Sequence, residues 1–425
     1  MKITDIRTAV VEANYDWTYT RVYTDEDITG IGESFLAPGL VSIINELKPL
    51  LIGEDPRNVD KLWSKMRWAT SGAGSMGGIV YNAISGIEAA LWDVVGKHYG
   101  APIHDFLGGK YRDRVRVYAD CHAGEALEAL TPILLERRPK WVEAGAGEPA
   151  GDDAGINYPA HGRAHGDLST EEVFTPEMYA DRARQVVSEM GFTALKFDLD
   201  VPNPYTQDTH SGTLTHAEVK FMASLVQAVR EAVGDTIDLA FDCHWRYNVS
   251  DALRLAYELE PYGLMWLEDP VPPENIGAMR RVTQGTKTPI ASGENYYLRF
   301  GFREILETGA LDIIAPDLQK VGGLLEARKI ADMADTHYVA VAPHCIASPI
   351  GTIASAHVAT AIPNYVALEW HGMSVPFWND MVTGLDGPVI ENGYIKVPQG
   401  PGLGVDLNEE VARQYAKEGE PFFGE

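Results

Sequence analysis

The sequence has little cysteine, little positive charge and no long hydrophobic run. Its three cysteines, Cys121, Cys243 and Cys345, lie far apart, which excludes a disulfide scaffold and is typical of a reducing cytoplasm. No run approaches the roughly 18 apolar residues that a membrane helix needs. The first residues, MKITDIRTAVVEAN, have no hydrophobic stretch of the kind found in secretory signals. We therefore expect a cytoplasmic protein.

Acidic residues outnumber basic ones by 61 to 35, so the formal net charge is 35 − 61 = −26. Nucleic acid and anionic membranes would be repelled, and we exclude both as partners. Such acidity is typical of a soluble surface, with salt tolerance as a second interpretation. Hydrophobic residues make up 45% and charged residues 23%, which is ordinary globular composition and excludes disordered and collagen-like classes.

The first part of the chain, residues 1–113, reads as a mixed α+β domain. Residues 21–34 predict a β-hairpin with an acidic turn. Residues 42–53 and 83–100 predict helices, and in the second the apolar residues Ile84, Ile87, Leu91 and Val94 recur at helical spacing. We expect this domain to cap the part that follows.

Strands alternate with amphipathic helices over residues 114–370. Eight short β-branched runs predict strands at 115–120, 193–198, 236–242, 264–269, 289–294, 312–317, 338–344 and 365–370. Helical patterns lie between them, for example at 216–233, 250–260 and 324–337. Eight such repeats predict an α/β fold, a (β/α)8-type barrel. Residues 371–425 are expected to return to the capping domain.

One connection departs from this pattern. Between the first two barrel strands, residues 143–172 are rich in glycine, proline, alanine and aspartate. A loop of this length predicts a lid, an interface element or disorder. His161 and His165 lie in it, and we interpret them as surface residues rather than as part of a lid.

Ionisable residues close the predicted barrel strands, where the chemistry of such barrels lies. Asp242, Glu268 and Glu294 are spaced by 26 residues each, so three successive strands bring three carboxylates to one rim. Carboxylates packed together repel one another unless a cation neutralises them. Oxygen-only ligands with room for water and substrate favour Mg²⁺. Isolated solvated loop residues or helix caps are a much weaker interpretation at this regular spacing.

Two histidines are candidates for proton transfer. His344 ends one strand and Asp317 ends the strand before it, so the carboxylate could orient the imidazole as a general base. His244 lies two residues after Asp242 and therefore on the same face. It could protonate a departing hydroxide, or it could merely orient a neighbouring residue.

The capping domain offers candidates for substrate contact. Trp17 and Arg21 could bind sugar hydroxyls or simply pack. Gly72, Gly74 and Gly77 form a literal G-x-G-x-x-G, but it follows a helical pattern rather than a strand, so we expect a flexible capping loop and no dinucleotide site. That absence also argues against a nucleotide-dependent oxidoreductase.

The strand ends resemble the enolase superfamily in its mandelate racemase-like branch, and the resemblance covers nearly the whole chain. The motifs that carry it are AISGIEAALWDVVGKHYGAPIHDFLGG (83–109), FDCH (241–244), WLEDP (266–270), SGEN (292–295), APDLQKVGG (315–323), APHC (342–345) and PGLGVDL (401–407). A lysine or histidine base with Mg²⁺ is typical of this superfamily. The resemblance also implies a homo-oligomer that acts on a small-molecule acid.

Within the branch the chain looks most like sugar-acid dehydratases of the galactonate type. The resemblance implies that Asp242 and His244 are metal ligand and acid, that Asp317 and His344 are the base dyad, and that Glu369 is a carboxylic acid bonded to the substrate carboxylate. Racemases of the branch carry Lys-x-Lys on the second strand, whereas this chain has Lys196-Phe197-Asp198. A two-base racemase is therefore disfavoured, and Lys196 is expected to bind the substrate carboxylate.

The implied reaction is the dehydration of an aldonate to a 2-keto-3-deoxy acid. Asp198 and Trp370, beside these strand ends, are further candidates for substrate contact. An acid-sugar epimerase and a mannonate-type dehydratase stay open as alternatives, and residues 143–172 depart from the galactonate pattern. A non-catalytic sugar-acid binding protein is a remote alternative, because every residue of the expected metal set and dyad is present.

Overall fold

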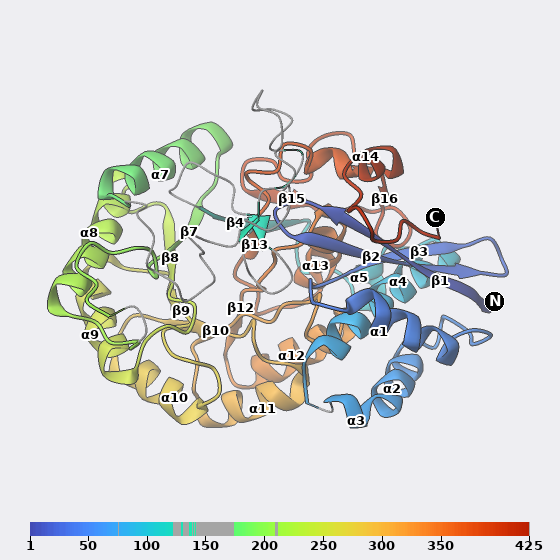
Figure 1. Ribbon diagram of the computed structural model, residues 1–425, viewed down its shortest axis with the longest axis horizontal. Coiled ribbons are helices and arrows are strands. Elements are labelled where there is room, and N and C mark those ends of the chain that lie inside the picture. Colours follow the sequence, from blue (N-terminus) through green and yellow to red (C-terminus); the bar gives the residue numbers. More distant parts are fainter. Residues whose placement is uncertain are drawn as a thin grey trace.

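The structure is a computed structural model that describes residues 1–74, 76–121, 129–130, 136–137, 139, 141, 174–208 and 211–424. The predicted loop at 143–172, with His161 and His165, lies outside the described residues. In Figure 1 the strands and helices of the barrel lie on one side, and the first and last parts of the chain lie together on the other.

A parallel barrel forms the larger part of the molecule, as the strand pattern predicted. The strands follow the order β12-β11-β10-β9-β8-β7-β4-β13, and a parallel bridge between Val341 and Tyr365 closes the ring. Their bounds are β4 Arg114–Asp120, β7 Ala194–Asp198, β8 Asp238–Asp242, β9 Trp266–Glu268, β10 Ile290–Ser292, β11 Ile313–Ile314, β12 Ala340–Val341 and β13 Leu368–Trp370. All eight predicted strands are confirmed. Most are shorter than predicted, because the polar residues at their ends lie outside the hydrogen-bonded part of the sheet.

Helices cover the outside of this ring and follow one another around it (Figure 1). They are α7 Pro176–Met190, α8 His216–Val233, α9 Val249–Leu259, α10 Ile276–Gly285, α11 Leu298–Thr308, α12 Leu324–Thr336 and α13 Pro349–Ala361, with the 3₁₀ turn η2 Glu260–Tyr262. The start of α8 shows why the sequence folds here: Thr215 and Glu218 form a capping box. A short pair, β5 Ala129–Leu130 and β6 Glu136–Arg137, follows β4.

The capping domain is an antiparallel sheet packed on a long helix. Its strands are β1 Ile3–Glu12, β2 Asp16–Thr24 and β3 Thr29–Ser34, and β2 with β3 is the predicted hairpin. Its helices are α1 Leu40–Leu47, η1 Lys48–Leu50, α2 Val59–Ala69, α3 Ser71–Gly74, α4 Ile79–Tyr99 and α5 Ile103–Phe106. A Cβ atom at Gly32 would come within 2.2 Å of the Gly86 carbonyl oxygen, so glycine lets β3 lie directly on α4.

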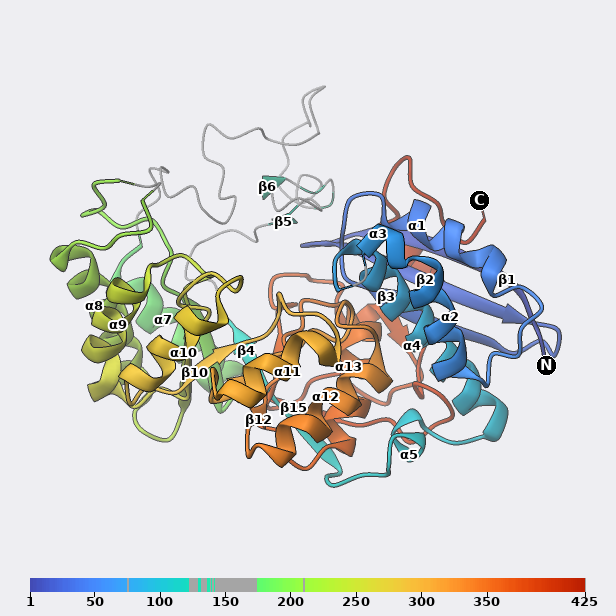
Figure 2. The same ribbon diagram turned by 90° about the horizontal axis from the view of Figure 1, so that it is seen from below.

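The tail returns to the capping domain, as expected. The amides of Lys417 and Phe423 donate to the carbonyl oxygens of Val10 and Thr8 of β1, and both termini lie at that end (Figure 2). The tail contains η3 Asn379–Met381, β14 Val382–Thr383, β15 Tyr394–Lys396, β16 Asp406–Leu407 and α14 Glu409–Gln414. Strand β15 pairs with barrel strand β4. The boundaries expected for the three parts of the chain stay a prediction.

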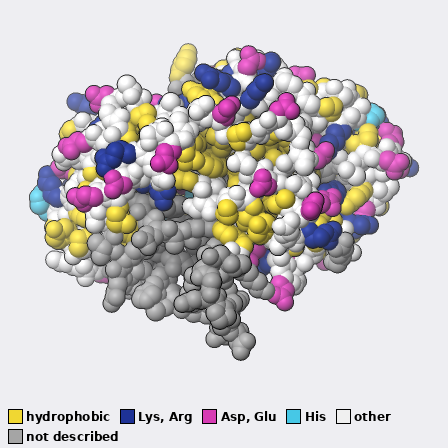
Figure 3. All heavy atoms as spheres, turned by 90° about the horizontal axis from the view of Figure 1, so that it is seen from above, with side chains coloured by type: hydrophobic (Ala, Val, Ile, Leu, Met, Phe, Trp, Pro, Cys, Tyr) yellow, Lys and Arg dark blue, Asp and Glu magenta, His cyan; other side chains and the backbone are white. Residues whose placement is uncertain are grey.

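Acidic and basic side chains are interspersed over the face in Figure 3, so the negative net charge is not gathered in one patch there. No helix of the described part of the chain is long and apolar enough to cross a membrane.

Glu88 of α4 joins the capping domain to the barrel. Its carboxylate accepts hydrogen bonds from the first amides of α12, those of Leu324 at 2.8 Å and Leu325 at 3.0 Å, and from the Trp92 indole at 2.7 Å. Burial raises the pKa of Glu88 to about 7, although these hydrogen bonds oppose the shift. A carboxylate at a helix N-terminus also complements the helix dipole.

We predict that Glu88→Ala lowers the free energy of unfolding by about 2–3 kcal/mol, because buried amides lose their acceptor. Urea titration measures the change. The matched control is Asp60→Ala, which breaks an exposed ion pair of 2.8 Å to Lys329 between α2 and the same helix α12. That change is expected to be small. Equal losses in the two variants would contradict the role of Glu88.

Candidate active site

Side-chain alternation along the barrel strands builds the site in layers. A lower layer inside the barrel is mostly small or aromatic and includes Ala194, Ala240 and Ala342. Two residues further along each strand the side chain points to the same interior, one layer higher. This second layer consists of Asp120, Lys196, Asp242, Glu268, His344 and Glu369, all buried. The residues between them, such as Phe197 and Phe241, face the outer helices and form the main core.

Three carboxylates of this rim meet at one point. Oxygens of Asp242, Glu268 and Glu294 lie within 4.8 Å of one another, and all three residues are at least 93% buried. The Glu268 Oε1 atom is buried without a hydrogen-bond partner in the part of the chain that the structure describes. An unpartnered buried carboxylate oxygen among hard oxygen donors fits a Mg²⁺ ion that would hold the three together.

The electrostatics of the three carboxylates agree with this fit. Burial, together with the charges of Asp242 and Glu369, raises the pKa of Glu268 to about 8, although Lys196 opposes the shift. Burial also acts on Asp242, but His244 and Lys196 outweigh it and hold the pKa of that carboxyl well below its usual range. Without a cation, one member of the set is thus biased toward its neutral form.

Lys196 is the positive charge closest to the three carboxylates. Its ammonium group lies 2.6 Å from Glu369 Oε1 and 3.0 Å from Asp242 Oδ2, with Glu268 at 3.6 Å and Asp120 at 3.8 Å. Burial would lower its pKa, but these carboxylates outweigh burial and raise it well above the usual value. Lys196 therefore stays charged and could bind a substrate anion.

Glu369 lies against Lys196 and His344, with Oε1 2.6 Å from the Lys196 ammonium group and Oε2 3.6 Å from His344 Nε2. Burial alone would raise its pKa, but Lys196 and His344 lower that pKa to about 2. Its Oε2 atom accepts a hydrogen bond of 2.8 Å from the Cys345 amide. These contacts favour the ionised carboxylate, and the expected hydrogen bond from Glu369 to the substrate carboxylate stays a prediction.

His344 and Asp317 come together as the strand ends predicted. The His344 Nδ1 atom lies 2.7 Å from Asp317 Oδ2, and Nε2 points to Glu294 Oε2 at 3.2 Å. Burial disfavours the charged imidazole, but Glu294, Glu369 and the hydrogen bond to Asp317 raise the pKa of His344 to about 10. Asp317 fixes the proton on Nδ1, so Nε2 is the nitrogen that faces the rim.

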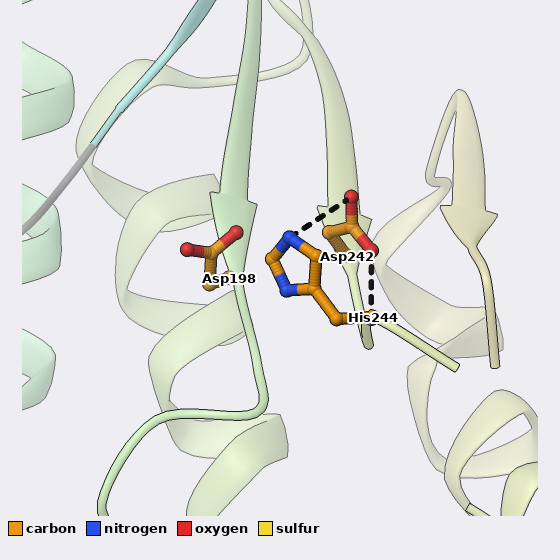
Figure 4. A group of neighbouring side chains, drawn as sticks. All are labelled: Asp198, Asp242 and His244. Atoms are coloured by element: carbon orange, nitrogen blue, oxygen red, sulfur yellow. Dashed lines mark hydrogen bonds and ion pairs between the residues drawn. The ribbon is translucent and has the colours of Figure 1, made fainter. Parts of the chain in front are cut away.

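His244 lies beside Asp242, one of the three carboxylates (Figure 4). Its ring stands between the carboxylates of Asp198 and Asp242, with Nε2 3.8 Å from Asp242 Oδ2 and Nδ1 2.8 Å from Asp200 Oδ1. Burial opposes the charge on this imidazole, but Asp200, Asp242 and Asp198 raise its pKa well above the usual value. A charged imidazole in this position can donate a proton.

Asp198 gives a second possible grouping for a cation. One ligand atom each from Asp198, Asp242 and His244 also lies within 4.8 Å of the others. Burial raises the pKa of Asp198 to about 6, although the charge of His244 opposes the shift. We favour the three-carboxylate set, because it offers oxygen ligands alone, which suit Mg²⁺.

Three residues of the site escaped the sequence analysis. Asp120 ends β4 in the same layer as Lys196, and His371 places Nε2 3.5 Å from Asp120 Oδ2. Asp200 orients His244. The signal for Asp120 was present, because it closes the first strand as Asp242 closes the third. Asp200 and His371 lie beyond their strands, where alternation no longer predicts direction.

Arg21 and Trp370 are not brought to this cluster. The Arg21 guanidinium pairs with Glu409 of the tail at 2.6 Å and lies over the Phe423 ring. Trp370 directly follows Glu369, so it points to the opposite face of β13 and stacks on Phe192 with ring centroids 5.5 Å apart. Both residues are therefore left out of the site.

The remaining candidates of the capping domain are Trp17 and the glycine motif that begins at Gly72. Trp17 is buried and lines a small pocket between the capping domain and the barrel loops. Gly72 and Gly74 were expected in a flexible loop but lie in the short helix α3, which follows helix α2 and no strand.

Two family descriptions match the chain. Residues 6–108 match the mandelate racemase/muconate lactonizing enzyme N-terminal domain, and residues 178–411 match the enolase C-terminal domain-like family. Together they cover most of the described residues.

Named relatives span the same length. A D-xylonate dehydratase of Haloferax volcanii is 44% identical over 100% of this chain and 91% of its own. A D-galactonate dehydratase of Ralstonia pickettii is 33% identical over 98% of this chain and 95% of its own. A mandelate racemase/muconate lactonizing enzyme-like protein of Rubrobacter xylanophilus superposes with a TM-score of 0.86, at 40% identity over 100% and 99% of the chains.

We predict that Glu268→Gln weakens Mg²⁺ binding at least about 100-fold, because it removes a charged ligand. Substitution of a residue outside the ligand set should reduce the Mg²⁺ affinity less. Isothermal titration calorimetry measures the affinity. Asp198→Asn is the matched control and is expected to weaken binding less, by about tenfold. A larger loss in Asp198→Asn than in Glu268→Gln would assign the ion to the cluster with His244 instead.

Proposed function

This chain belongs to the mandelate racemase/muconate lactonizing enzyme family of the enolase superfamily, and on that premise we propose that it is a Mg²⁺-dependent sugar-acid dehydratase. One observation carries the proposal: two imidazoles, each oriented by its own aspartate, approach different members of the three carboxylates. His344, with Asp317, lies 3.2 Å from Glu294, and His244, with Asp200, lies 3.8 Å from Asp242. One base and one acid suit the removal of a proton and a hydroxyl from neighbouring carbons.

The substrate would be an aldonate, and D-xylonate is the first to test because the relative of that name is 44% identical over the whole chain. D-Galactonate is the second, from the relatives at 30–33% identity. A racemase needs a second base, but Asp198 lies where racemases of the branch carry lysine. The cytoplasmic location and the homo-oligomer stay predictions from the sequence and the resemblance.

Asp242, Glu268 and Glu294 would hold the Mg²⁺ ion, which supplies positive charge where the substrate carboxylate gains negative charge. Lys196 would bind the same carboxylate, since its ammonium group is buried and remains charged. A proton α to a carboxylate is too weakly acidic for histidine alone. Positive groups fixed in advance on the carboxylate side make its removal feasible.

His344 would take the C2 proton on Nε2, and the electron pair of that C–H bond would pass toward the carboxylate. Those electrons then expel the C3 hydroxyl, which His244 protonates, so that water leaves. The enol that forms takes up a proton at C3 and loses the proton of its C2 hydroxyl, which gives a 2-keto-3-deoxy acid. The balance is the loss of one water, with no oxidant or reductant.

We predict that His344→Asn and His244→Asn each lower keto-acid formation at least about 100-fold, because each removes a proton-transfer group. In heavy water, His244→Asn should still exchange the C2 proton for deuterium, since His344 is intact, whereas His344→Asn should not. His337→Asn, at the exposed end of α12, is the control and should behave as wild type. Full turnover in either site variant would contradict these roles, and exchange with inversion but no keto acid would favour an epimerase.

We predict that exhaustive chelation abolishes dehydration and that added Mg²⁺ restores it, because the positive charge that the ion would supply to the substrate carboxylate is then lost. A keto-acid assay before and after dialysis against chelator measures this. Activity that survives chelation would contradict the metal-dependent mechanism.

A further inference from the structure

The backbone around the proposed acid departs from regular strand geometry. Eight described residues other than glycine have a positive φ, and three of them lie here: His244 at 41°, Trp245 at 52° and Asp269 at 43°. Residues with a side chain rarely adopt this left-handed conformation, which persists only where the surrounding structure fixes it. The chain is therefore held in an unusual shape just beyond the ends of β8 and β9.

The left-handed pair after β8 turns His244 back toward the rim. In an extended chain two residues advance about 7 Å, which would carry the side chain of residue 244 past Asp242. Instead the His244 amide donates to Asp242 Oδ1 at 2.9 Å, and the Nε2 atom lies 3.8 Å from Asp242 Oδ2. Asp200 lies 2.8 Å from Nδ1 and fixes the rotation of the ring, but the backbone sets the direction in which the side chain leaves it.

The segment after β9 holds this turn through its carbonyl groups. Three amides of the turn donate to three consecutive carbonyl oxygens: Cys243 to Glu268 at 3.1 Å, Trp245 to Asp269 at 2.6 Å and Tyr247 to Pro270 at 3.1 Å. The donors are two residues apart, whereas the acceptors follow one another directly. Carbonyl groups alternate in direction along an extended strand, so consecutive ones that face the same segment show that the chain is not extended there. The positive φ of Asp269 is the cause.

The two backbone groups of Asp269 accordingly point to different neighbours. Its amide donates to the Ala291 carbonyl oxygen of β10 at 3.0 Å, whereas its carbonyl oxygen accepts from Trp245 on the other side. In an extended strand both groups of one residue face the same neighbour. The left-handed conformation thus turns the Asp269 carbonyl oxygen away from β10 and toward the His244 turn.

The Asp269 side chain is fixed by β10. Its Oδ1 atom accepts a hydrogen bond from the Ser292 hydroxyl, and both residues are 1% exposed. Aspartate and asparagine tolerate a left-handed backbone better than other residues with a side chain, because their short polar groups can form local hydrogen bonds. Asp269 therefore suits this position both by its backbone tolerance and by its hydrogen bond to Ser292.

We propose that Asp269 is a positioning residue for the acid His244. Ser292 holds Asp269, the left-handed Asp269 presents its carbonyl oxygen to Trp245, and that bond keeps His244 directed at Asp242. The inference rests on the proposed function and deepens it, because it assigns the direction of the acid to a residue outside the three-carboxylate set. Loss of this support impairs protonation of the C3 hydroxyl and leaves removal of the C2 proton by His344 intact.

The test compares Asp269→Ala with Asp269→Asn and wild type. Alanine disfavours the left-handed conformation and cannot bond to Ser292, so keto-acid formation should fall at least about tenfold, because a misplaced acid loses its reactive geometry. Exchange of the C2 proton for deuterium in heavy water should be retained, and so should the Mg²⁺ affinity measured by calorimetry. Asparagine tolerates the left-handed backbone and its Oδ1 atom can accept from Ser292, so Asp269→Asn should restore dehydration.

Asp27→Ala is the matched control. Asp27 also has a positive φ, 57°, but it is exposed in the turn between β2 and β3 of the capping domain. The same substitution at the same backbone conformation should therefore leave the kinetics as in wild type. If Asp269→Ala loses its fold by circular dichroism, Ser292→Ala gives the same comparison, with a smaller loss of dehydration and retained exchange.

Dehydration at the wild-type rate in Asp269→Ala would overturn the positioning role. A parallel loss of dehydration, exchange and Mg²⁺ affinity would also overturn it, since Asp269 would then support the metal ligands instead. A crystal structure of Asp269→Ala gives a readout without substrate: residue 244 should leave its positive φ, and an unchanged φ would contradict the role. Wild type that neither exchanges nor dehydrates any aldonate would overturn the proposed function, whereas an active wild type with an equally active Asp269→Ala would overturn the positioning alone.

Discussion

One buried ammonium group surrounded by carboxylates constrains the whole site. Lys196 lies within 3.8 Å of Asp120, Asp242, Glu268 and Glu369, all of which are at least 94% buried. One ammonium group cannot balance four ionised carboxylates in a buried site, so burial and the neighbouring charges raise the pKa of Glu268 to about 8 and that of Asp120 well above its usual value. The barrel holds these groups together because each sits on a different strand of a closed ring. The excess negative charge makes the rim a place for a divalent cation and for an anionic substrate that shares the cation.

The same ring separates the acid from the base. His344 ends β12 and His244 follows β8, so strands β9, β10 and β11 lie between them in the sheet. Each imidazole has its own aspartate, Asp317 or Asp200, and each is therefore oriented independently of the other. Carboxylates raise the pKa of both histidines. A cation on Glu294 would oppose that effect mainly at His344, which contacts Glu294 directly at 3.2 Å. Neighbours alone can thus make one imidazole the base and the other the acid.

The sequence predicted the barrel well because its strands carry two signals together, β-branched runs and a polar residue at each end. It also predicted which of those end residues meet, since one strand–helix unit per step returns the chain to the same rim. Arg21 and Trp370 could not be judged in this way. The direction of Arg21 depends on a tail nearly 400 residues away, and Trp370 was selected for its position beside Glu369 although adjacent strand residues face opposite sides. Asp200 escaped because the chain leaves β7 at Asp198 and alternation ends there.

The capping domain is tied to the barrel close to the proposed base. Two contacts cross the junction: the Phe35 amide donates to the Gln319 carbonyl oxygen at 3.0 Å, and the Glu88 carboxylate accepts hydrogen bonds from the start of α12. The Gln319 backbone amide also donates to Asp317, which orients His344. A shift of the capping domain would therefore move the loop that orients His344, so the junction and the proposed base are coupled through one loop.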